Sequence, residues 1–124
     1  MADLPDRDVA LVLDMLSAAR DATDFVRGMD LDGFRASRLH QNAVIRSVEV
    51  VGEAAGRVSD ATVAAHPDIP WRSITGMRHR LIHGYADVDI DLVWSVTQHQ
   101  LPELIALLDA LISTEGPEDI QKPD

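Results

Sequence analysis

The chain has 124 residues and carries 21 acidic against 11 basic side chains, a formal net charge of −10. Hydrophobic residues make up 46% of it, enough for one domain with a buried core, which excludes global disorder. The absence of cysteine excludes disulfides and thiolate metal sites. The negative charge argues against a protein that coats nucleic acid irrespective of sequence, so a role on nucleic acid requires a local cationic site.

The N-terminus, MADLPDRDVALVLDML, is acidic from its start and lacks the cationic region of a signal peptide. No apolar run approaches the roughly 18 residues of a membrane span. We therefore expect a soluble, cytoplasmic protein without a membrane partner.

Apolar residues at helical spacing predict a first helix over about 5–28 and a second over about 36–58. Pro5 suits the start of the first helix and Gly28 its end. The DLDGF stretch between them is predicted as a turn, with a short helical start at Asp32.

Gly52 and Gly56 lie four residues apart in the second helix. Glycine costs about 1 kcal/mol in a helix interior, so the pair indicates close approach of a neighbouring helix. The alternative is that both glycines are merely tolerated.

After the HPDIP turn, a third helix is predicted over about 70–83, with Gly84 just past its end. A fourth is predicted over about 89–113, begun by Asp87 or Asp89 and kinked or divided by Pro102. No segment alternates with a period of two, so the fold class is all-α, an up-and-down bundle of four or five helices. We assign residues 1–114 to this domain and 115–124 to a flexible acidic tail.

Two stretches of this acidic chain contain no acid, one between Asp32 and Glu49 and one between Asp68 and Asp87. They could form one cationic groove if their helices pack together, or be ordinary solvated surface. Glu49 and Glu53 next to Arg46 indicate a salt bridge, which could be buried against an arginine of the third helix; the alternative is a catalytic pair of carboxylates. Trp71 and Trp94 have apolar neighbours and are predicted in the core. The cationic residues of the two stretches are Arg35, Arg38, His40 and Arg46, then Arg72, Arg78, His79, Arg80 and His83.

Arg78 and His83 have the chemistry for RNA cleavage. At the end of the predicted helix, the dipole would raise the pKa of His83 toward neutrality, which suits proton transfer. The Arg78 guanidinium suits phosphate. On an ideal helix the two lie about 140° apart, so two copies facing each other across a two-fold axis would make a compact composite site. Alternatively, His79 and His83 could bind a metal as an i, i+4 pair, although the sequence nearby offers no carboxylate.

The stretch MRHRLIHGY, with Arg78, four residues, His83, one residue and Tyr85, resembles the signature of the HepT-like branch of HEPN-domain proteins. The stretches AVIRSVEVVGEAAGRVS, IPWRSITGMR and YADVDIDLVW match as well, so the resemblance covers about residues 5–112. His79 departs mildly from the family, in which a small polar residue often follows the arginine.

The resemblance implies a HEPN-like helical bundle that forms a homodimer, with Arg78 and His83 of both subunits as the catalytic residues of a metal-independent ribonuclease. It also implies the toxin of a type VII toxin–antitoxin pair. The antitoxin would be an MntA-like minimal nucleotidyltransferase that silences the toxin by AMPylation of Tyr85. The chain itself would need no cofactor, whereas the partner would use ATP and Mg. We expect His79, Arg80, Arg46 and Arg38 to assist or to bind RNA. The alternative function is a non-catalytic module that only docks the nucleotidyltransferase.

Overall fold

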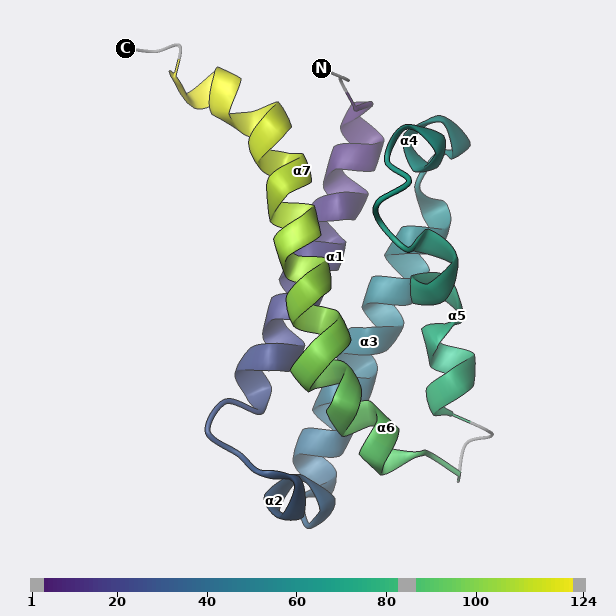
Figure 1. The fold of residues 1–124 in the computed structure, drawn as a ribbon, viewed down its shortest axis with the longest axis vertical. Coiled ribbons are helices and arrows are strands. Elements are labelled where there is room, and N and C mark those ends of the chain that lie inside the picture. The colour runs from purple at the N-terminus through teal and green to yellow at the C-terminus, as the bar shows by residue number, and fades with distance from the viewer. Residues whose placement is uncertain (1–3, 83–86, 122–124) are drawn as a thin grey trace.

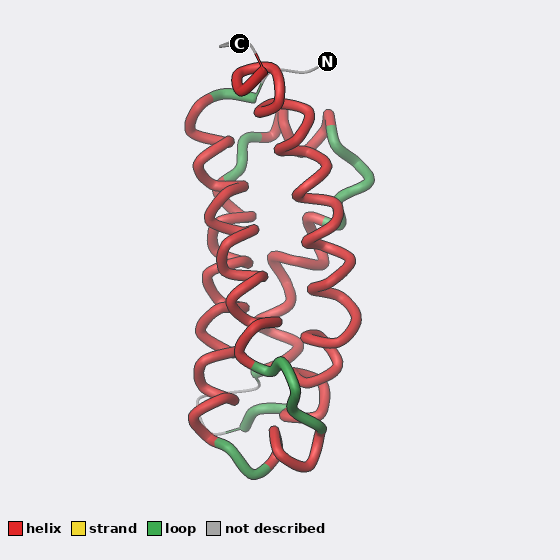
Figure 2. The backbone as a smooth tube through the Cα atoms, turned by 90° about the vertical axis from the view of Figure 1, so that its left-hand side faces the viewer, coloured by secondary structure: helices red, strands yellow, loops and turns green. Residues whose placement is uncertain are grey.

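The computed structural model describes residues 4–82 and 87–121, with side chains as far as Ser113. This part of the chain is helical and contains no strand, which confirms the all-α prediction. The chain runs down, up, down and up again between the two ends of an elongated bundle, as Figures 1 and 2 show. The elements are α1 (Asp6–Phe25), α2 (Leu31–Arg35), α3 (Arg38–Arg57), α4 (Asp60–Ala65), α5 (Trp71–Leu81), α6 (Ile90–Ser95), the π-helical segment η1 (Val96–Gln100) and α7 (Leu101–Gln121).

Three long helices form the body of the bundle. α1 packs against both α3 and α7, and α3 also packs against α5 (Figure 1). Each fully buried aliphatic side chain stabilises the fold by about 1.5–3 kcal/mol. Trp71 is 8% exposed, and the partly buried Trp94 ring packs on the Phe34 ring at 5.4 Å between centroids, so both tryptophans belong to the core as predicted. The most deeply buried aliphatic residues are Val12, Met15, Val44, Val51, Leu81, Val93, Leu101 and Leu108.

The predicted close approach of helices occurs at Gly52. A Cβ atom there would lie 3.3 Å from the carbonyl oxygen of Ile74 on α5. At Gly56 the nearest atom would be Cγ2 of Thr75 at 3.8 Å, an ordinary contact. Gly52 therefore lets the backbones of α3 and α5 approach, and Gly56 does not have this role.

Pro102 divides the last helix as expected, through a π-helical turn. The Leu101 N–H donates to the carbonyl of Val96, five residues back. Proline has no N–H and its ring would clash with the carbonyl four residues earlier, so the wider turn accommodates it without ending the helix. α7 then continues to Gln121, beyond the predicted end at 113.

The structure also differs from the prediction between the second and the fourth predicted helices. The short helix α4 was not predicted; Ser59 caps its start, and the Ser59 side chain accepts a hydrogen bond from the Thr62 N–H. The predicted helix 70–83 ends earlier, at Leu81, and Ile82 is extended with φ −123° and ψ 114°. The carbonyl of Leu81 accepts the Asp89 N–H at 2.9 Å, a tertiary hydrogen bond that replaces the next helical one. Gly84 is therefore not the residue that ends this helix.

Candidate functional site

A groove lies between α3 and α5, where Gly52 brings the two helices together. We call it the α3–α5 groove; its volume is about 380 Å³. On α5 its residues fall on one helical face, within about 100° of each other. The two acid-free stretches of the sequence thus meet in one groove, although acids of α3 also line it. Its lining residues are Arg46, Glu49, Gly52, Glu53, Thr75, Arg78 and His79.

Arg78 is held in this groove by an ion pair. Its Nε donates to Oε2 of Glu49 at 3.0 Å, which confirms the predicted salt bridge between Glu49 and an arginine of the third helix. The pair is not buried, because 53% of the Arg78 side chain and 29% of the Glu49 side chain remain exposed. Such a pair stabilises the fold by less than about 1 kcal/mol, so its effect is mainly on where the guanidinium lies. The ion pair uses the Nε–H of Arg78, and the guanidinium carries further N–H donors on its terminal nitrogens, which suit an anion such as phosphate.

Arg46 and His79 lie in the same groove, and both side chains are exposed. Glu53, the other acid of the groove, pairs with Arg57 at 3.5 Å. Arg46 forms no ion pair within the described part of the chain, although the sequence places it beside both glutamates. An anion in the groove could therefore meet two guanidinium groups: that of Arg46, which has no carboxylate partner, and that of Arg78, which is oriented by Glu49.

Two other predicted site residues lie elsewhere. Arg80 is about 200° around α5 from Arg78, and its Nη1 donates to Oγ of Ser73 at 3.3 Å. Arg38 is the first residue of α3, about 12 Å along the axis from Arg46, and does not line the α3–α5 groove. Of the four residues expected to assist, the structure brings His79 and Arg46 next to Arg78.

His83 and Tyr85 lie outside the described residues, so their pairing with Arg78 stays a prediction. The structure describes the two flanks of this segment. Ile82 and Val88 form an isolated antiparallel bridge, and the Asp89 side chain accepts from the Leu92 N–H, which makes Asp89 the N-cap of α6. Two arguments for His83 assumed a helix as far as residue 83, whereas α5 ends at Leu81 and Ile82 is extended, so both arguments lose that support.

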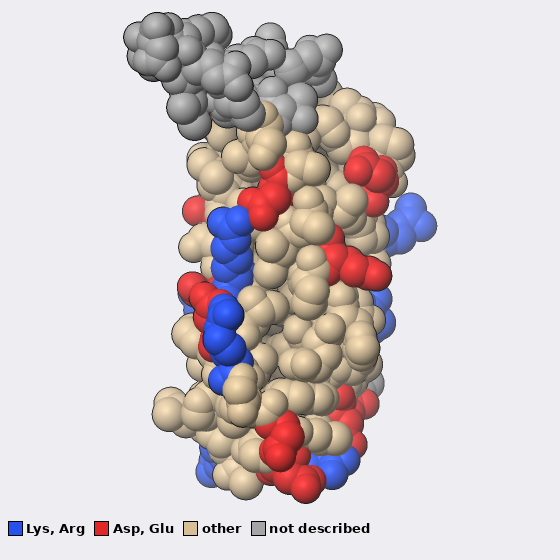
Figure 3. All heavy atoms as spheres, turned by 60° about the vertical axis from the view of Figure 1, so that its left-hand side comes forward, with Lys and Arg blue, Asp and Glu red and all other residues tan. Residues whose placement is uncertain are grey.

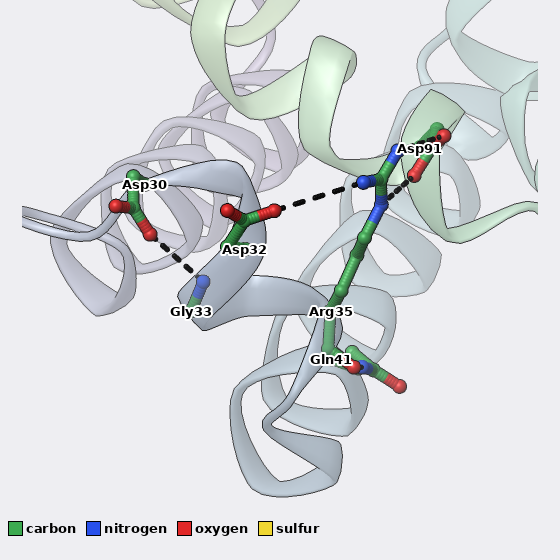
Figure 4. A network of polar contacts seen from close by, with 6 residues as sticks. All are labelled: Asp30, Asp32, Gly33, Arg35, Gln41 and Asp91. Carbon is green, nitrogen blue, oxygen red and sulfur yellow. Dashed lines mark hydrogen bonds and ion pairs between the residues drawn. The ribbon is translucent and has the colours of Figure 1, made fainter.

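The start of α6 is fixed to α2 by a second arginine, Arg35 (Figure 4). Its Nε and Nη2 donate to the two carboxylate oxygens of Asp91 at 2.8 and 2.7 Å. The hydrogen bonds from Arg35 lower the pKa of Asp91. Arg35 was counted among the cations of an acid-free stretch, but the fold neutralises it with an acid 56 residues away.

Three other arginines, Arg20, Arg27 and Arg57, also form ion pairs. On the face seen in Figure 3, basic and acidic groups lie next to each other. Arg20 of α1 donates to both oxygens of Asp109 on α7 at 2.6 Å, and Arg27 pairs with Asp24. No group of three or more histidine, aspartate or glutamate side chains within the described residues could hold a metal ion.

Comparison with known proteins gives the family. The family model described as "Ribonuclease HepT-like" matches residues 15–111. The chain belongs to the HepT-like family. It is 32% identical to "Putative RNase MJ0127" of Methanocaldococcus jannaschii over 94% of this chain and 97% of that protein. It is 34% identical to "Probable ribonuclease HepT" of Thermococcus cleftensis over 73% of this chain and 83% of that protein. No solved structure matches it.

The HepT-like match spans the second half of α1 through the first half of α7, and so includes the α3–α5 groove and the motif. The HEPN-like all-α fold expected from the resemblance agrees with the structure. Thr75 is a groove residue that the sequence did not single out; it faces α3 one turn before Arg78. No helix in the described ranges is long and apolar enough to cross a membrane.

Proposed function

We propose that this HepT-like chain is a ribonuclease toxin that cleaves RNA without a metal ion, at a site of Arg78 and His83 supplied by both subunits of a homodimer. The observation that carries the proposal is the ion pair of Arg78 with Glu49, which holds the guanidinium at the α3–α5 groove through its Nε and leaves the donors of its terminal nitrogens for a phosphate. The names of the relatives support a ribonuclease.

In the proposed reaction, the His83 imidazole takes the proton of a ribose 2′-hydroxyl as general base. The 2′-oxygen attacks the adjacent phosphorus and the bond to the 5′-oxygen breaks. The guanidinium of Arg78 stabilises the charge that develops on the phosphoryl oxygens. The leaving 5′-oxygen gains a proton from an imidazolium, so the products carry a 2′,3′-cyclic phosphate and a 5′-hydroxyl.

We further propose that an MntA-like nucleotidyltransferase with ATP and Mg silences the toxin at Tyr85. The phenol oxygen attacks the α-phosphorus of ATP, pyrophosphate leaves, and the phenol proton passes to solvent. The added nucleotide is anionic and bulky, and it lies two residues from His83 in the sequence. It would compete with an RNA phosphate for Arg78 and Arg46 by charge and by volume.

A second candidate is a non-catalytic module that docks the nucleotidyltransferase. The Glu49–Arg78 pair favours it in one respect, because an arginine already held by a carboxylate can serve as a fixed docking residue. Partner binding without cleavage of any RNA and without growth arrest would distinguish this module from the enzyme.

The test is cleavage of RNA by the purified protein and by His83→Ala and Arg78→Ala variants. We expect both variants to lose cleavage while the oligomeric state, measured by light scattering, is unchanged. The matched controls are His99→Ala and Arg27→Ala, since both side chains are exposed and lie outside the groove. Full activity in His83→Ala ends the proposal. For the partner, an intact-mass gain of AMP units on co-expression should disappear in Tyr85→Phe.

A further inference from the structure

A second groove lies on the other side of α5, between this helix and the α4–α5 connection. Its volume is about 730 Å³, and it shares no lining residue with the α3–α5 groove. We call it the α4–α5 groove. Its floor contains buried Ile69 and Trp71, and its rim contains the exposed rings of Pro67 and Pro70. Its cationic edge consists of Arg72 and Arg80.

The two arginines of this groove are free of carboxylates. Both are exposed, and neither forms an ion pair within the described residues; Arg80 contacts only the hydroxyl of Ser73. The arginines in ion pairs are Arg20, Arg27, Arg35, Arg57 and Arg78. In a chain with 21 acids and 11 basic residues, unpaired arginines at one groove mark a surface suited to an anionic partner.

The spacing of the cations on α5 suits a strand rather than a single small anion. Arg72 and Arg80 are eight residues apart, about 12 Å along the helix axis and about 80° around it. A stacked strand rises about 3.4 Å per nucleotide, so this separation corresponds to roughly three or four nucleotides. Arg78 lies on the opposite side of the same helix, which is about 10 Å thick with its side chains. A strand crossing α5 could therefore contact both grooves.

The apolar lining favours single-stranded nucleic acid over a simple polyanion. Proline rings offer flat apolar surface to bases, and guanidinium planes can stack on them. Trp71, only 8% exposed, closes the floor and offers little surface to a base. Grooves that bind single strands without strict sequence preference combine cations for phosphates with side chains on which bases stack; here the proline rings and the guanidinium planes would have to supply the stacking surface.

We propose that the α4–α5 groove binds the single-stranded RNA that flanks the scissile phosphodiester, with Arg72 and Arg80 on its phosphates. This inference rests on the proposed ribonuclease function, which supplies the substrate. The α4–α5 groove would be a binding site remote from the bond that is cut. Changes to this groove should therefore alter the affinity for the substrate and leave the rate of the chemical step unchanged.

The experiment uses the full-length protein and a labelled single-stranded RNA with 2′-O-methyl groups, which lacks the attacking hydroxyl and cannot be cut. An Arg72→Gln/Arg80→Gln double variant should bind it about tenfold more weakly than the wild type, with a salt slope smaller by about 1.4 for two lost phosphate contacts. With cleavable RNA, KM should rise while kcat stays the same. The matched control is Arg20→Gln/Arg27→Gln, which removes the same charge from α1 and the turn after it. Circular dichroism melts establish that both double variants are folded.

If the wild type cleaves RNA and the two double variants bind and cleave alike, the inference is wrong and the proposed function stands. If the wild type neither binds nor cleaves RNA, both fail together. If Arg72→Gln/Arg80→Gln retains RNA affinity but loses an acidic protein partner, the groove is a protein-docking surface and the inference is overturned.

Discussion

Asp8 provides the sharpest test of the fold. Its side chain is 1% exposed, and its carboxylate joins the first turn of α1 to the start of α4. It accepts hydrogen bonds from the hydroxyls of Ser59 and Thr62 at 2.5 Å each, and from the Ser59 N–H at 3.1 Å. Burial of the carboxyl opposes its ionisation, but these hydrogen bonds outweigh that effect and lower the pKa of Asp8.

Replacing Asp8 with alanine leaves buried donors without their acceptor. Hydrogen bonds to a charged group contribute about 1.5–3 kcal/mol each, but the two hydroxyls can partly pair with each other, since Ser59 Oγ lies 3.3 Å from Thr62 Oγ1. We therefore expect a total loss of about 3 kcal/mol. The unfolding entropy of 124 residues is about 0.26 kcal/mol/K, so Tm should fall by about 12 °C.

The loss should depend on pH in a defined direction. Because the folded pKa of Asp8 is lowered, its stabilisation is fully present above the unfolded value of about 3.9 and is lost as pH falls through the folded pKa. The difference in Tm between wild type and Asp8→Ala should thus be constant from neutral pH to about 5 and shrink below about 4. Thermal melts followed by circular dichroism measure both effects. Asp14→Ala is the control, as an exposed acid of the same helix expected to change stability by less than about 0.5 kcal/mol. Equal losses in the two variants, or no dependence on pH, would refute the reasoning.

Two further predictions concern the helix contacts. Gly56→Ala should raise Tm by about 2–4 °C, because alanine has the higher helix propensity. In Gly52→Ala the new Cβ atom would lie 3.3 Å from the Ile74 carbonyl oxygen, which must shift, so this variant should have a lower Tm than Gly56→Ala. Equal melting temperatures of the two variants would contradict the close approach of α3 and α5. Arg20→Gln should cost less than about 1 kcal/mol, because the side chains of Arg20 and Asp109 are half exposed, and the cost should vanish in about 1 M salt. A loss as large as that of Asp8→Ala would show that the Arg20 pair is more than a surface contact.

Apolar periodicity predicted the long helices, because a helix that buries one face needs that pattern whatever its neighbours are. It did not reveal α4, since six residues are too few for a stripe, although Ser59 at its start is a recognisable cap. The end of α5 was missed because the stop is tertiary: the Leu81 carbonyl bonds to Asp89, eight residues further on. Pro102 indicated where the regular hydrogen bonding of the last helix is interrupted. That the interruption takes the form of a π-helical segment depends on how α6 and α7 pack, which the sequence pattern does not show.

The candidate site was predictable to the extent that it depends on local sequence. Two acid-free stretches indicated a cationic surface, and the fold does bring Arg46 and Arg78 together. Absence of acids along the sequence does not mean absence in space, because Asp91 reaches Arg35 and Glu49 reaches Arg78. The sequence indicated that Glu49 could pair with an arginine of the third helix, whereas the Arg35–Asp91 pair could not be assigned from spacing alone.

The fold determines where unneutralised positive charge remains. Within the described residues five arginines form no ion pair: Arg7, Arg38, Arg46, Arg72 and Arg80. Three of them, Arg46, Arg72 and Arg80, line the grooves on the two sides of α5. The Glu49 carboxylate weakens the attraction of the α3–α5 groove for phosphate, yet it orients Arg78, the guanidinium that the motif pairs with the proposed base. Exact placement of a charged group contributes more to a transition state than an additional mobile charge does, because a fixed group need not reorganise during the reaction. Under the proposed function, binding and catalysis make different demands on this helix, and we expect different arginines to meet them: unpaired ones for affinity, and the one paired with Glu49 for the reacting phosphate.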